Sequence, residues 1–237
     1  MVINGTAQKG CTYHMKEMFL DAFGREHEIE EYTLPTDCPV FCAGCKACFF
    51  EDISVCPHKK YTEPLWESIS RADVLLVTSP VYVFHAAGQV KALLDHYGTK
   101  WMAHSPEAQM FSKQAVVLTN AVGMGMKNVL KDIGDSLDFW GVARRYSVRQ
   151  TLFETDWTRV SDKRKESVRR QCQRVCRRLQ GRSAVAPRLK IKLLFTVMSI
   201  AQRFIHKSQL RAGQSESADH RRWRENGWLN GGKPWRA

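Results

Sequence analysis

Short apolar runs alternate with amphipathic segments over most of the chain. Residues 74–77 are apolar without interruption, which is typical of a strand in a parallel sheet that is covered on both faces. Residues 128–141 instead place Val129, Ile133 and Leu137 on one face, because apolar residues recur there at helical spacing. The pattern therefore indicates buried strands and surface helices.

The two kinds of segment follow one another in a regular order. Strands are predicted at residues 1–4, 27–34, 72–82 and 143–152, and residues 114–125 read as a strand followed by a turn with Gly123 and Gly125. Helices are predicted at residues 15–23, 61–71, 88–98, 128–141 and 157–180. Such alternation predicts an α/β fold built on a doubly wound parallel sheet of five strands. We expect the ligand of such a sheet outside the carboxyl ends of its strands.

The last part of the chain has a different character. Residues 183–188 read as a linker, and residues 190–207 read as a strongly apolar helix with basic ends. Three tryptophans follow, at positions 223, 228 and 235. We therefore predict one domain over residues 1–182 and a basic, tryptophan-containing helical extension over residues 183–237.

Composition and charge narrow the class of protein. No segment has the order of charges and apolar residues of a signal peptide, and no run of about 18 residues is apolar enough to span a membrane. We expect a cytoplasmic protein whose eight cysteines are reduced. Residues 141–237 hold 24 Lys and Arg and 7 Asp and Glu, whereas residues 1–140 hold 12 Lys and Arg and 17 Asp and Glu. This asymmetry indicates either a solvated basic face or contact with an anionic partner.

Three loops leave the carboxyl ends of the predicted strands. The first is rich in hydroxyl groups and opens a helix, so its amide groups suit a phosphate. The second offers flat apolar surfaces, and the third brings small residues close together. A phosphate end and a flat ring together describe flavin mononucleotide (FMN), although ordinary turns use the same residue types. The cofactor-binding residues that we predict are Thr6, Gln8, Gly10, Cys11, Thr12, Tyr13, Ser79, Pro80, Val81, Tyr82, Val83, Phe84, Thr119, Asn120, Ala121 and Gly123.

Two stretches carry a family resemblance. INGTAQKGCTYHMKEMFL resembles the phosphate loop of flavodoxin-like NAD(P)H-dependent FMN reductases, and TSPVYVFHAAGQVKALLDH resembles their second loop. The resemblance covers residues 1–150 and implies a flavodoxin-like fold, FMN as cofactor, NAD(P)H as donor and a homodimer. The chain departs from the family at residues 6–8, where Thr-Ala-Gln replaces the usual Ser-Pro-Arg and removes one phosphate contact.

The loop 38–58 holds four closely spaced cysteines, Cys42, Cys45, Cys48 and Cys56, in the pattern C-x2-C-x2-C-x7-C. This run resembles that of the iron-sulfur flavoproteins of the same superfamily, which implies a [4Fe–4S] cluster on these four thiolates. A zinc site, in which His58 replaces one sulfur, is an alternative. Thiols that bind no metal are another.

The resulting hypothesis is an oxidoreductase. Electrons pass from NAD(P)H or a ferredoxin through FMN, with or without the cluster, to a quinone, a flavin or a protein acceptor. We identify no catalytic side chain, since no acid–base or nucleophile constellation stands out, and His85 reads as a loop residue that can donate a hydrogen bond near the flavin.

The alternative hypothesis is a binding module that uses the basic C-terminal helix. Over residues 189–207, Ile191, Leu194, Met198, Ala201 and Ile205 form one stripe, and Leu193, Val197, Ile200 and Phe204 widen it. Such a helix covers the core, forms a dimer interface or lies on an anionic membrane. We expect no nucleic-acid partner, because the sequence contains no recognised nucleic-acid-binding motif.

Overall fold

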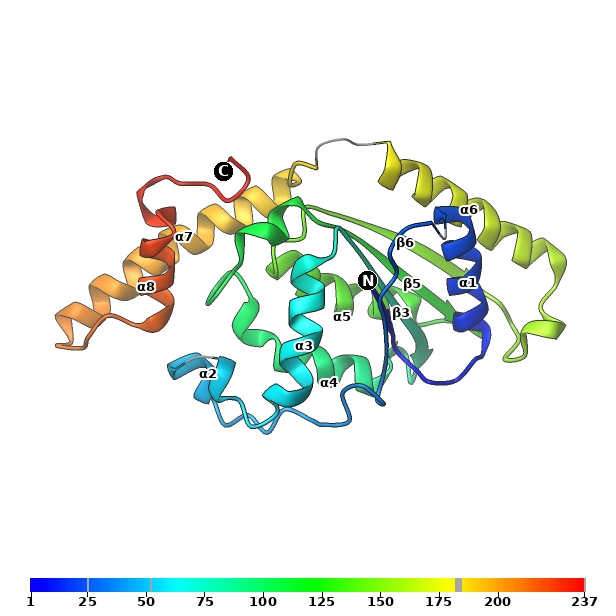
Figure 1. Ribbon diagram of the computed structural model, residues 1–237, viewed down its shortest axis with the longest axis horizontal. Helices are drawn as coiled ribbons and strands as arrows, with labels where there is room; N and C mark the ends of the chain where they lie inside the picture. Colours follow the sequence, from blue (N-terminus) through cyan, green and yellow to red (C-terminus); the bar gives the residue numbers. More distant parts are fainter. Residues whose placement is uncertain (25, 52, 182–184, 237) are drawn as a thin grey trace.

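A parallel β-sheet forms the centre of the computed structural model, which describes residues 1–24, 26–51, 53–181 and 185–236 (Figure 1). The sheet order is β2-β1-β3-β5-β6, and all neighbouring strands in it are parallel. These strands are β1 (Val2–Asn4), β2 (Glu31–Thr33), β3 (Val74–Tyr82), β5 (Gln114–Ala121) and β6 (Arg144–Thr151). The two-residue β4 (His85–Ala86) pairs antiparallel with the end of β3. The predicted α/β fold is thereby confirmed.

Helices cover both faces of the sheet. One face packs against α1 (Cys11–Phe23) and α6 (Asp162–Gln180), and the other against α3 (Lys59–Arg71), α4 (Gly88–His96) and α5 (Met126–Phe139). All eight residues of β5 are buried, as expected of a central strand that is covered on both faces. Short connecting helices are α2 (Ala47–Phe50) and the 3₁₀ turns η1 (Ile53–Val55), η2 (Gly98–Lys100), η3 (Ala108–Ser112), η4 (Trp157–Arg159) and η5 (Trp228–Asn230).

Element ends differ from the predictions where local hydrogen bonding decides them. The helix predicted from residue 15 already begins at Cys11, directly after Gly10. The helix predicted from residue 157 begins at Asp162, because Asp156 accepts a hydrogen bond from the amide of Thr158 and closes a separate 3₁₀ turn. These side-chain contacts compete with the helix and move its start.

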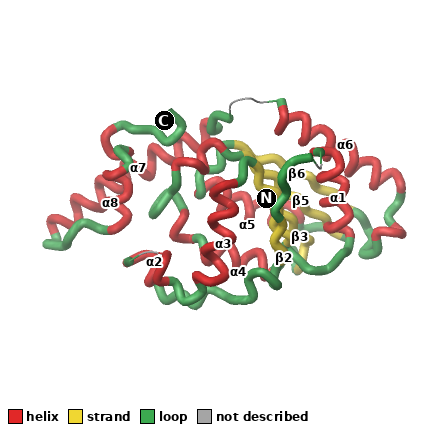
Figure 2. Tube along the Cα trace, in the orientation of Figure 1, coloured by secondary structure: helices red, strands yellow, loops and turns green. Residues whose placement is uncertain are grey.

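Over residues 185–236 the C-terminal extension consists of helices and loops, with no strand (Figure 2). Helices α7 (Leu189–Arg211) and α8 (Ala218–Glu225) lie side by side at one end of the molecule (Figure 1). They enclose a third apolar core together with two side chains of the main domain. Its buried members are Met102, Phe111, Ile191, Phe195, Trp223, Trp228 and Leu229. The extension is therefore packed onto the domain.

A buried aspartate anchors this extension. Asp138 of α5 has a side chain only 2% exposed, and it pairs with Arg145, Arg188 and Lys190 at 2.7–2.9 Å. Two of these cations belong to the segment that starts α7. The predicted boundary at 182/183 falls outside the described residues and stays a prediction.

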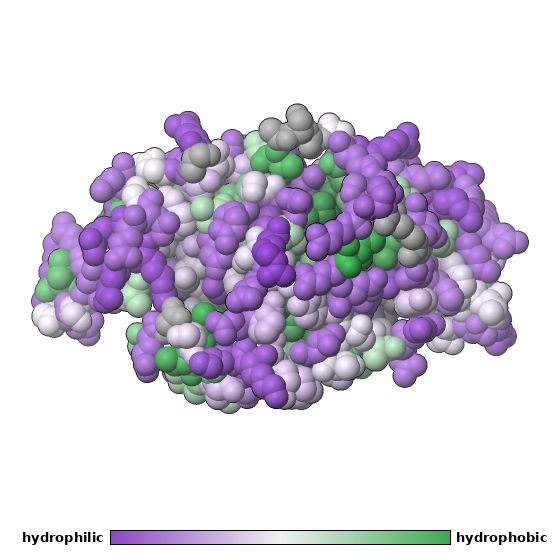
Figure 3. Space-filling model, in the orientation of Figure 1, coloured by the Kyte–Doolittle hydropathy of each residue, from purple (hydrophilic) through white to green (hydrophobic). Residues whose placement is uncertain are grey.

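The exterior is mainly hydrophilic on the face drawn in Figure 3, where a small hydrophobic group lies over α2. In the described ranges of the chain, no helix has both the length and the apolar character needed to cross a bilayer.

Candidate active site

A cavity of about 490 Å³ opens at the carboxyl ends of the strands. The connections after β1 and β3 leave to opposite faces of the sheet, so a crevice forms between these neighbouring strands. In the flavodoxin-like strand order this switch point is where FMN binds. The lining residues are Thr6, Gln8, Lys9, Gly10, Cys11, Thr12, Pro80, Val81, Tyr82, Asn120, Ala121, Val122, Glu154 and Thr155.

Gly5 holds the first loop against the end of β3. Its amide donates to the carbonyl oxygen of Thr78 at 2.9 Å, and a Cβ on Gly5 would lie only 2.3 Å from that oxygen. The loop then reaches Gly10, the N-cap of α1, whose first turn carries no acidic residue. The amide groups of a first helical turn have no acceptor within the helix and attract phosphate. The first loop thus offers an anion site.

Polar contacts fix the floor of the cavity. The buried hydroxyl of Thr12 donates a short hydrogen bond to Oδ1 of Asn120, which ties the start of α1 to the end of β5. Lys16 is paired with Glu17 and Glu31 at 2.8 and 2.7 Å. Lys9 is the cation that lines the cavity. Positive charge near α1 therefore comes from Lys9 and from the helix terminus.

The second loop places three residues on the cavity and uses a fourth as a brace. Pro80, Val81 and Tyr82 line the cavity. Ser79 is buried, and its hydroxyl donates to the carbonyl of Pro80 at 2.9 Å and accepts from the amide of Ala87 at 3.0 Å. Ser79 therefore shapes the loop from inside.

Val83 and Phe84 form the tip of the β3–β4 hairpin. Both have positive φ, 48° and 65°, which is strained for a β-branched and an aromatic residue. Val83 is 92% exposed. Gly125 lies directly against this hairpin, because a Cβ there would meet Val81 at 2.6 Å. His85 is held by Asp132 of α5, with Nδ1 and Oδ2 3.0 Å apart.

The loop after β6 adds residues that the sequence reasoning missed. Glu154 and Thr155 line the cavity, as do Lys9 and Val122. The thiol of Cys11 donates to the carbonyl of Thr155 at 3.4 Å, and burial raises the pKa of that thiol. The rule that ligands bind at the carboxyl ends of strands, applied to this fifth strand as well, would have found the residues after β6.

The predicted residues separate into three groups. Ten line the cavity: Thr6, Gln8, Gly10, Cys11, Thr12, Pro80, Val81, Tyr82, Asn120 and Ala121. Tyr13 lines a neighbouring cavity of about 370 Å³ that shares Thr6, Gln8 and Thr12 with the first. Five lie outside the lining of both cavities: Ser79, Val83, Phe84, Thr119 and Gly123.

The four clustered cysteines lie between β2 and α3 and form no disulfide. Cys42 and Cys45 are exposed, whereas Cys48 and Cys56 are half-buried. Burial raises the pKa of the Cys48 thiol, and negative charge on Cys56, Cys42 and Cys45 raises it further. The other three sulfurs are therefore each within electrostatic reach of Cys48.

The sulfurs are spaced more widely than a zinc site requires. No three of them lie within 4.8 Å of one another, whereas tetrahedral zinc with bonds of about 2.3 Å holds sulfurs roughly 3.8 Å apart. His58, the further ligand of the zinc alternative, has its Nδ1 2.9 Å from Nε2 of His96. The loop is braced from the α4 side, where Thr99 donates to the carbonyl of Cys48.

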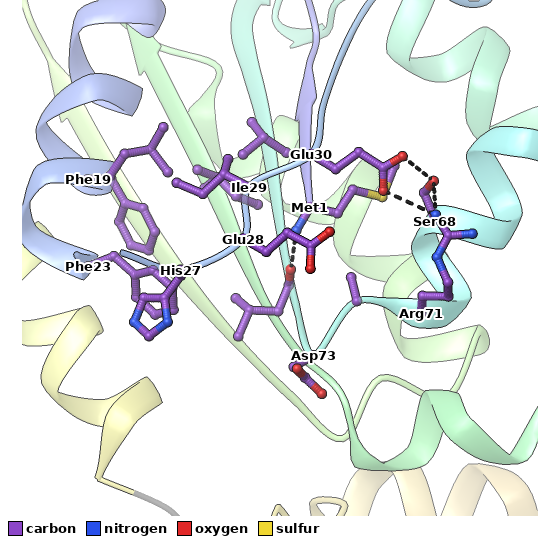
Figure 4. A pocket seen from close by; sticks show the side chains of 15 residues that line it. Met1, Phe19, Phe23, His27, Glu28, Ile29, Glu30, Ser68, Arg71 and Asp73 are labelled. Carbon is purple, nitrogen blue, oxygen red and sulfur yellow. Dashed lines mark hydrogen bonds and ion pairs between the residues drawn. The ribbon is translucent and has the colours of Figure 1, made fainter. Parts of the chain in front are cut away.

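A second cavity, of about 590 Å³, is larger than the first and lies at the amino ends of the strands. Figure 4 shows Met1, Ile29, Glu30, Ser68 and Asp73 around it, close to the amino ends of β1 and β3. Ligands of doubly wound sheets bind at the carboxyl ends, so the smaller cavity is the candidate site.

Comparisons with known proteins identify the family of the chain. Residues 1–153 match the model of the NADPH-dependent FMN reductase family. A flavone reductase structure has a TM-score of 0.54 at 13% identity over 79% of this chain, and the chain spans less than two thirds (65%) of that protein. No curated protein sequence matches.

Two further structures are similar over nearly their whole length. An FMN-dependent NADH-azoreductase from Bacillus anthracis str. Ames Ancestor, in complex with FMN, has a TM-score of 0.54 at 14% identity, covering 74% of this chain and 98% of that one. An NADH:FMN oxidoreductase in its apo form has a TM-score of 0.52 at 18% identity, covering 78% and 92%. At these identities the likeness shows the fold. Because the family match spans well over half of the chain, this protein is an oxidoreductase that belongs to the NADPH-dependent FMN reductase family.

Proposed function

We propose that this protein holds FMN in the cavity at the carboxyl ends of β1, β3 and β5 and passes electrons from NADPH or NADH to a small-molecule acceptor. The proposal rests on one observation: in a chain of this family, the N-terminus of α1 and the apolar loop after β3 line the same cavity. FMN supplies hydride and single-electron chemistry when it is bound.

The chain's own residues would bind and orient the cofactor. Amide groups at the start of α1 and the ammonium of Lys9 would hold the phosphate. Pro80, Val81 and Tyr82 present an apolar surface to a ring, and the small Ala121 allows close approach to the backbone. The hydrogen bonds of Ser79 keep the second loop in this shape.

A charge placed at the helix terminus tests the proposal. A Cβ on Gly10 would meet no other atom within 4 Å, so the N-cap has room for the base of a side chain, and Gly10→Glu adds a carboxylate there. Gly88→Glu, at the start of α4, is the matched control, since Gly88 is equally open. We expect NADPH to bleach the absorbance of added FMN in wild type and in the control under anaerobic conditions, and not in Gly10→Glu. Equal bleaching in all three proteins would refute the site.

For the cysteine loop we propose a [4Fe–4S] cluster on Cys42, Cys45, Cys48 and Cys56, which would also admit a ferredoxin as donor. The proposal is supported by four thiols in one loop, of which Cys42, Cys45 and Cys56 all act electrostatically on Cys48. Anaerobic reconstitution should give about four iron and four sulfide per chain by the composition of the cluster. Cys48→Ser should lose both, and Cys38→Ala, outside the quartet, should retain them. Zinc without sulfide would contradict the proposal.

The rim of the cavity supports a homodimer. Exposed apolar side chains gather on the loops after β3, β5 and β6: Tyr82, Val83, Phe84, Val122, Met124 and Phe153. The strained hairpin tip belongs to this rim, and strain of that kind persists at functional surfaces. A second copy that covers the rim would bury these groups. Sedimentation velocity should show a dimer for wild type and a monomer for Val83→Glu, and a wild-type monomer would rule the dimer out.

A second candidate function is attachment to an anionic membrane through α7. The face with Ile191 and Phe195 is buried in the third core, as the core-covering alternative anticipated. The opposite face exposes a stripe at helical spacing: Leu189, Leu193, Val197, Ile200 and Phe204. An apolar stripe open to solvent on a folded helix calls for a partner surface.

Charge favours lipid over a second copy as that partner. The 23 residues of α7 include five Lys and Arg and no Asp or Glu. Two such helices would bring like charges together, whereas an anionic bilayer would attract them. Apolar residues with basic neighbours are the composition of helices that lie in a membrane interface.

Vesicle binding tests this attachment. The full chain should co-sediment with vesicles that contain phosphatidylglycerol, less so with pure phosphatidylcholine, and less at high salt. Phe204→Glu should weaken binding at least roughly tenfold, given about 1.5–3 kcal/mol for burying such a side chain. Phe41→Glu changes an equally exposed phenylalanine elsewhere and should leave binding intact. If Phe204→Glu instead dissociated a dimer and left vesicle binding unchanged, the stripe would be assigned to self-association.

A further inference from the structure

Two histidines and a glutamate converge where α7 meets α8. His206 lies on α7, Glu216 lies in the connection between the helices, and His220 lies in the first turn of α8. One ligand atom from each lies within 4.8 Å of the other two. These residues take no part in the flavin site or the cysteine loop, and their proximity depends on the packing of α8 onto α7.

Two of the three side chains are hydrogen-bonded to each other, and the third is not bonded to either of them. Glu216 Oε1 and His220 Nδ1 are 2.7 Å apart, which is a hydrogen bond. His206 Nδ1 is buried and has no hydrogen-bond partner among the described residues. The rings of His206 and His220 stack with centroids 3.7 Å apart and planes 14° apart.

From this geometry we propose that His206, Glu216 and His220 bind a divalent transition-metal ion such as Zn²⁺. Two imidazoles and a carboxylate are a donor set that zinc accepts. Tetrahedral zinc separates its nitrogen and oxygen ligands by roughly 3.3 Å, given bonds of about 2.0–2.1 Å. Binding would therefore require the Glu216–His220 pair to open from 2.7 Å, and the proton between them would be released to water as the ion takes its place.

Surrounding groups fit an outer shell of such a site. Arg224 donates to both carboxylate oxygens of Glu216, each at 3.0 Å, and so holds the carboxylate in place. Metal-bound carboxylates are commonly oriented by such hydrogen bonds. A cavity of about 360 Å³ borders both histidines and also contacts Arg203 and Asn230. It leaves the fourth ligand position to water or a small anion.

The role that follows for the ion is to fasten α8 to α7. The connection over residues 212–217 is exposed for most of its length, so the helices are joined there by few contacts. The ion would bind the closed arrangement and not the open one, and would stabilise it by mass action. At an ion concentration of about 100 times Kd, the open population falls roughly 100-fold.

Cobalt titration of the full chain tests the site directly. Co²⁺ should bind here with visible d–d absorption and without the charge-transfer band of thiolate ligands, which separates this site from the cysteine loop. His206→Ala and the nearly isosteric Glu216→Gln should each abolish that signal. His27→Ala, a partly exposed histidine elsewhere, should keep it. Unchanged signals in both site variants, or thiolate signals alone, would overturn the proposal.

Limited proteolysis gives a second readout. Zn²⁺ at about 100 times Kd should slow tryptic cleavage after Arg222, within α8, by roughly 100-fold, because cleavage inside the docked helix follows the open population. The same addition should leave cleavage of Glu216→Gln unchanged. Equal protection of wild type and variant would mean that zinc acts elsewhere and would contradict the assignment.

Discussion

Gly5→Ala is the substitution whose effect the structure determines most sharply. The added Cβ would lie 2.3 Å from the carbonyl oxygen of Thr78 and 2.6 Å from Cγ2 of Val90. A relaxed carbon–oxygen contact is about 3.3–3.6 Å, so the loop must retreat by about 1 Å. Overpacking of this kind costs about 1–3 kcal/mol, and the lost Gly5–Thr78 hydrogen bond costs about 1 kcal/mol. We expect a loss of about 2–4 kcal/mol.

Urea unfolding of the apoprotein, followed by far-ultraviolet circular dichroism, measures this loss. Gly123→Ala is the control, because its Cβ would meet no atom within 4 Å and its φ is not positive. The free energy of unfolding of that variant should equal that of wild type or exceed it by up to about 1 kcal/mol. FMN affinity of Gly5→Ala should also fall, since the retreating loop carries the start of α1. An unfolding free energy within about 0.5 kcal/mol of wild type would refute the packing argument.

Three further predictions follow from buried ionisable groups. Asp138→Asn removes the buried charge that pairs with three cations, so it should lower the free energy of unfolding by about 3 kcal/mol and speed proteolytic release of the extension; an unchanged urea midpoint would contradict this. Burial raises the pKa of Cys172 to about 12, so iodoacetamide at neutral pH should modify the exposed Cys45 and spare Cys172, as peptide mass spectrometry would show. Burial lowers the pKa of His96 from 6.5, so the unfolded chain takes up a proton at this residue before the folded chain does as the pH falls. The contribution of His96 to the free energy of unfolding should therefore be constant above about pH 6.5 and decrease below it. In urea titrations His96→Gln should remove that decrease.

Local pattern was sufficient to predict the sheet. The apolar run from residue 74 and the helical spacing in 128–141 are properties of neighbouring residues, so both elements could be predicted. The cavity could be anticipated from one topological rule, which placed Thr12 and Asn120 together although they are far apart in the chain.

Features that depend on tertiary packing could not be read from the pattern. Residues 189–207 are apolar on nearly all sides, and only the docked helix reveals that Phe195 is buried while Phe204 is exposed. Ser79 resembles a ligand-facing residue until its two internal hydrogen bonds are seen. The convergence of His206 with His220 likewise depends on how α8 packs against α7.

Titration of the apoprotein with FMN and with riboflavin tests the central claim, a flavin site with its phosphate at the start of α1. We predict quenching of flavin fluorescence at one FMN per chain and at least roughly tenfold weaker binding of riboflavin, because a charged hydrogen bond contributes about 1.5–3 kcal/mol. Gly10→Glu should remove the preference for FMN and leave the weak binding of riboflavin. Equal affinities for the two flavins, or no quenching by either, would contradict the account.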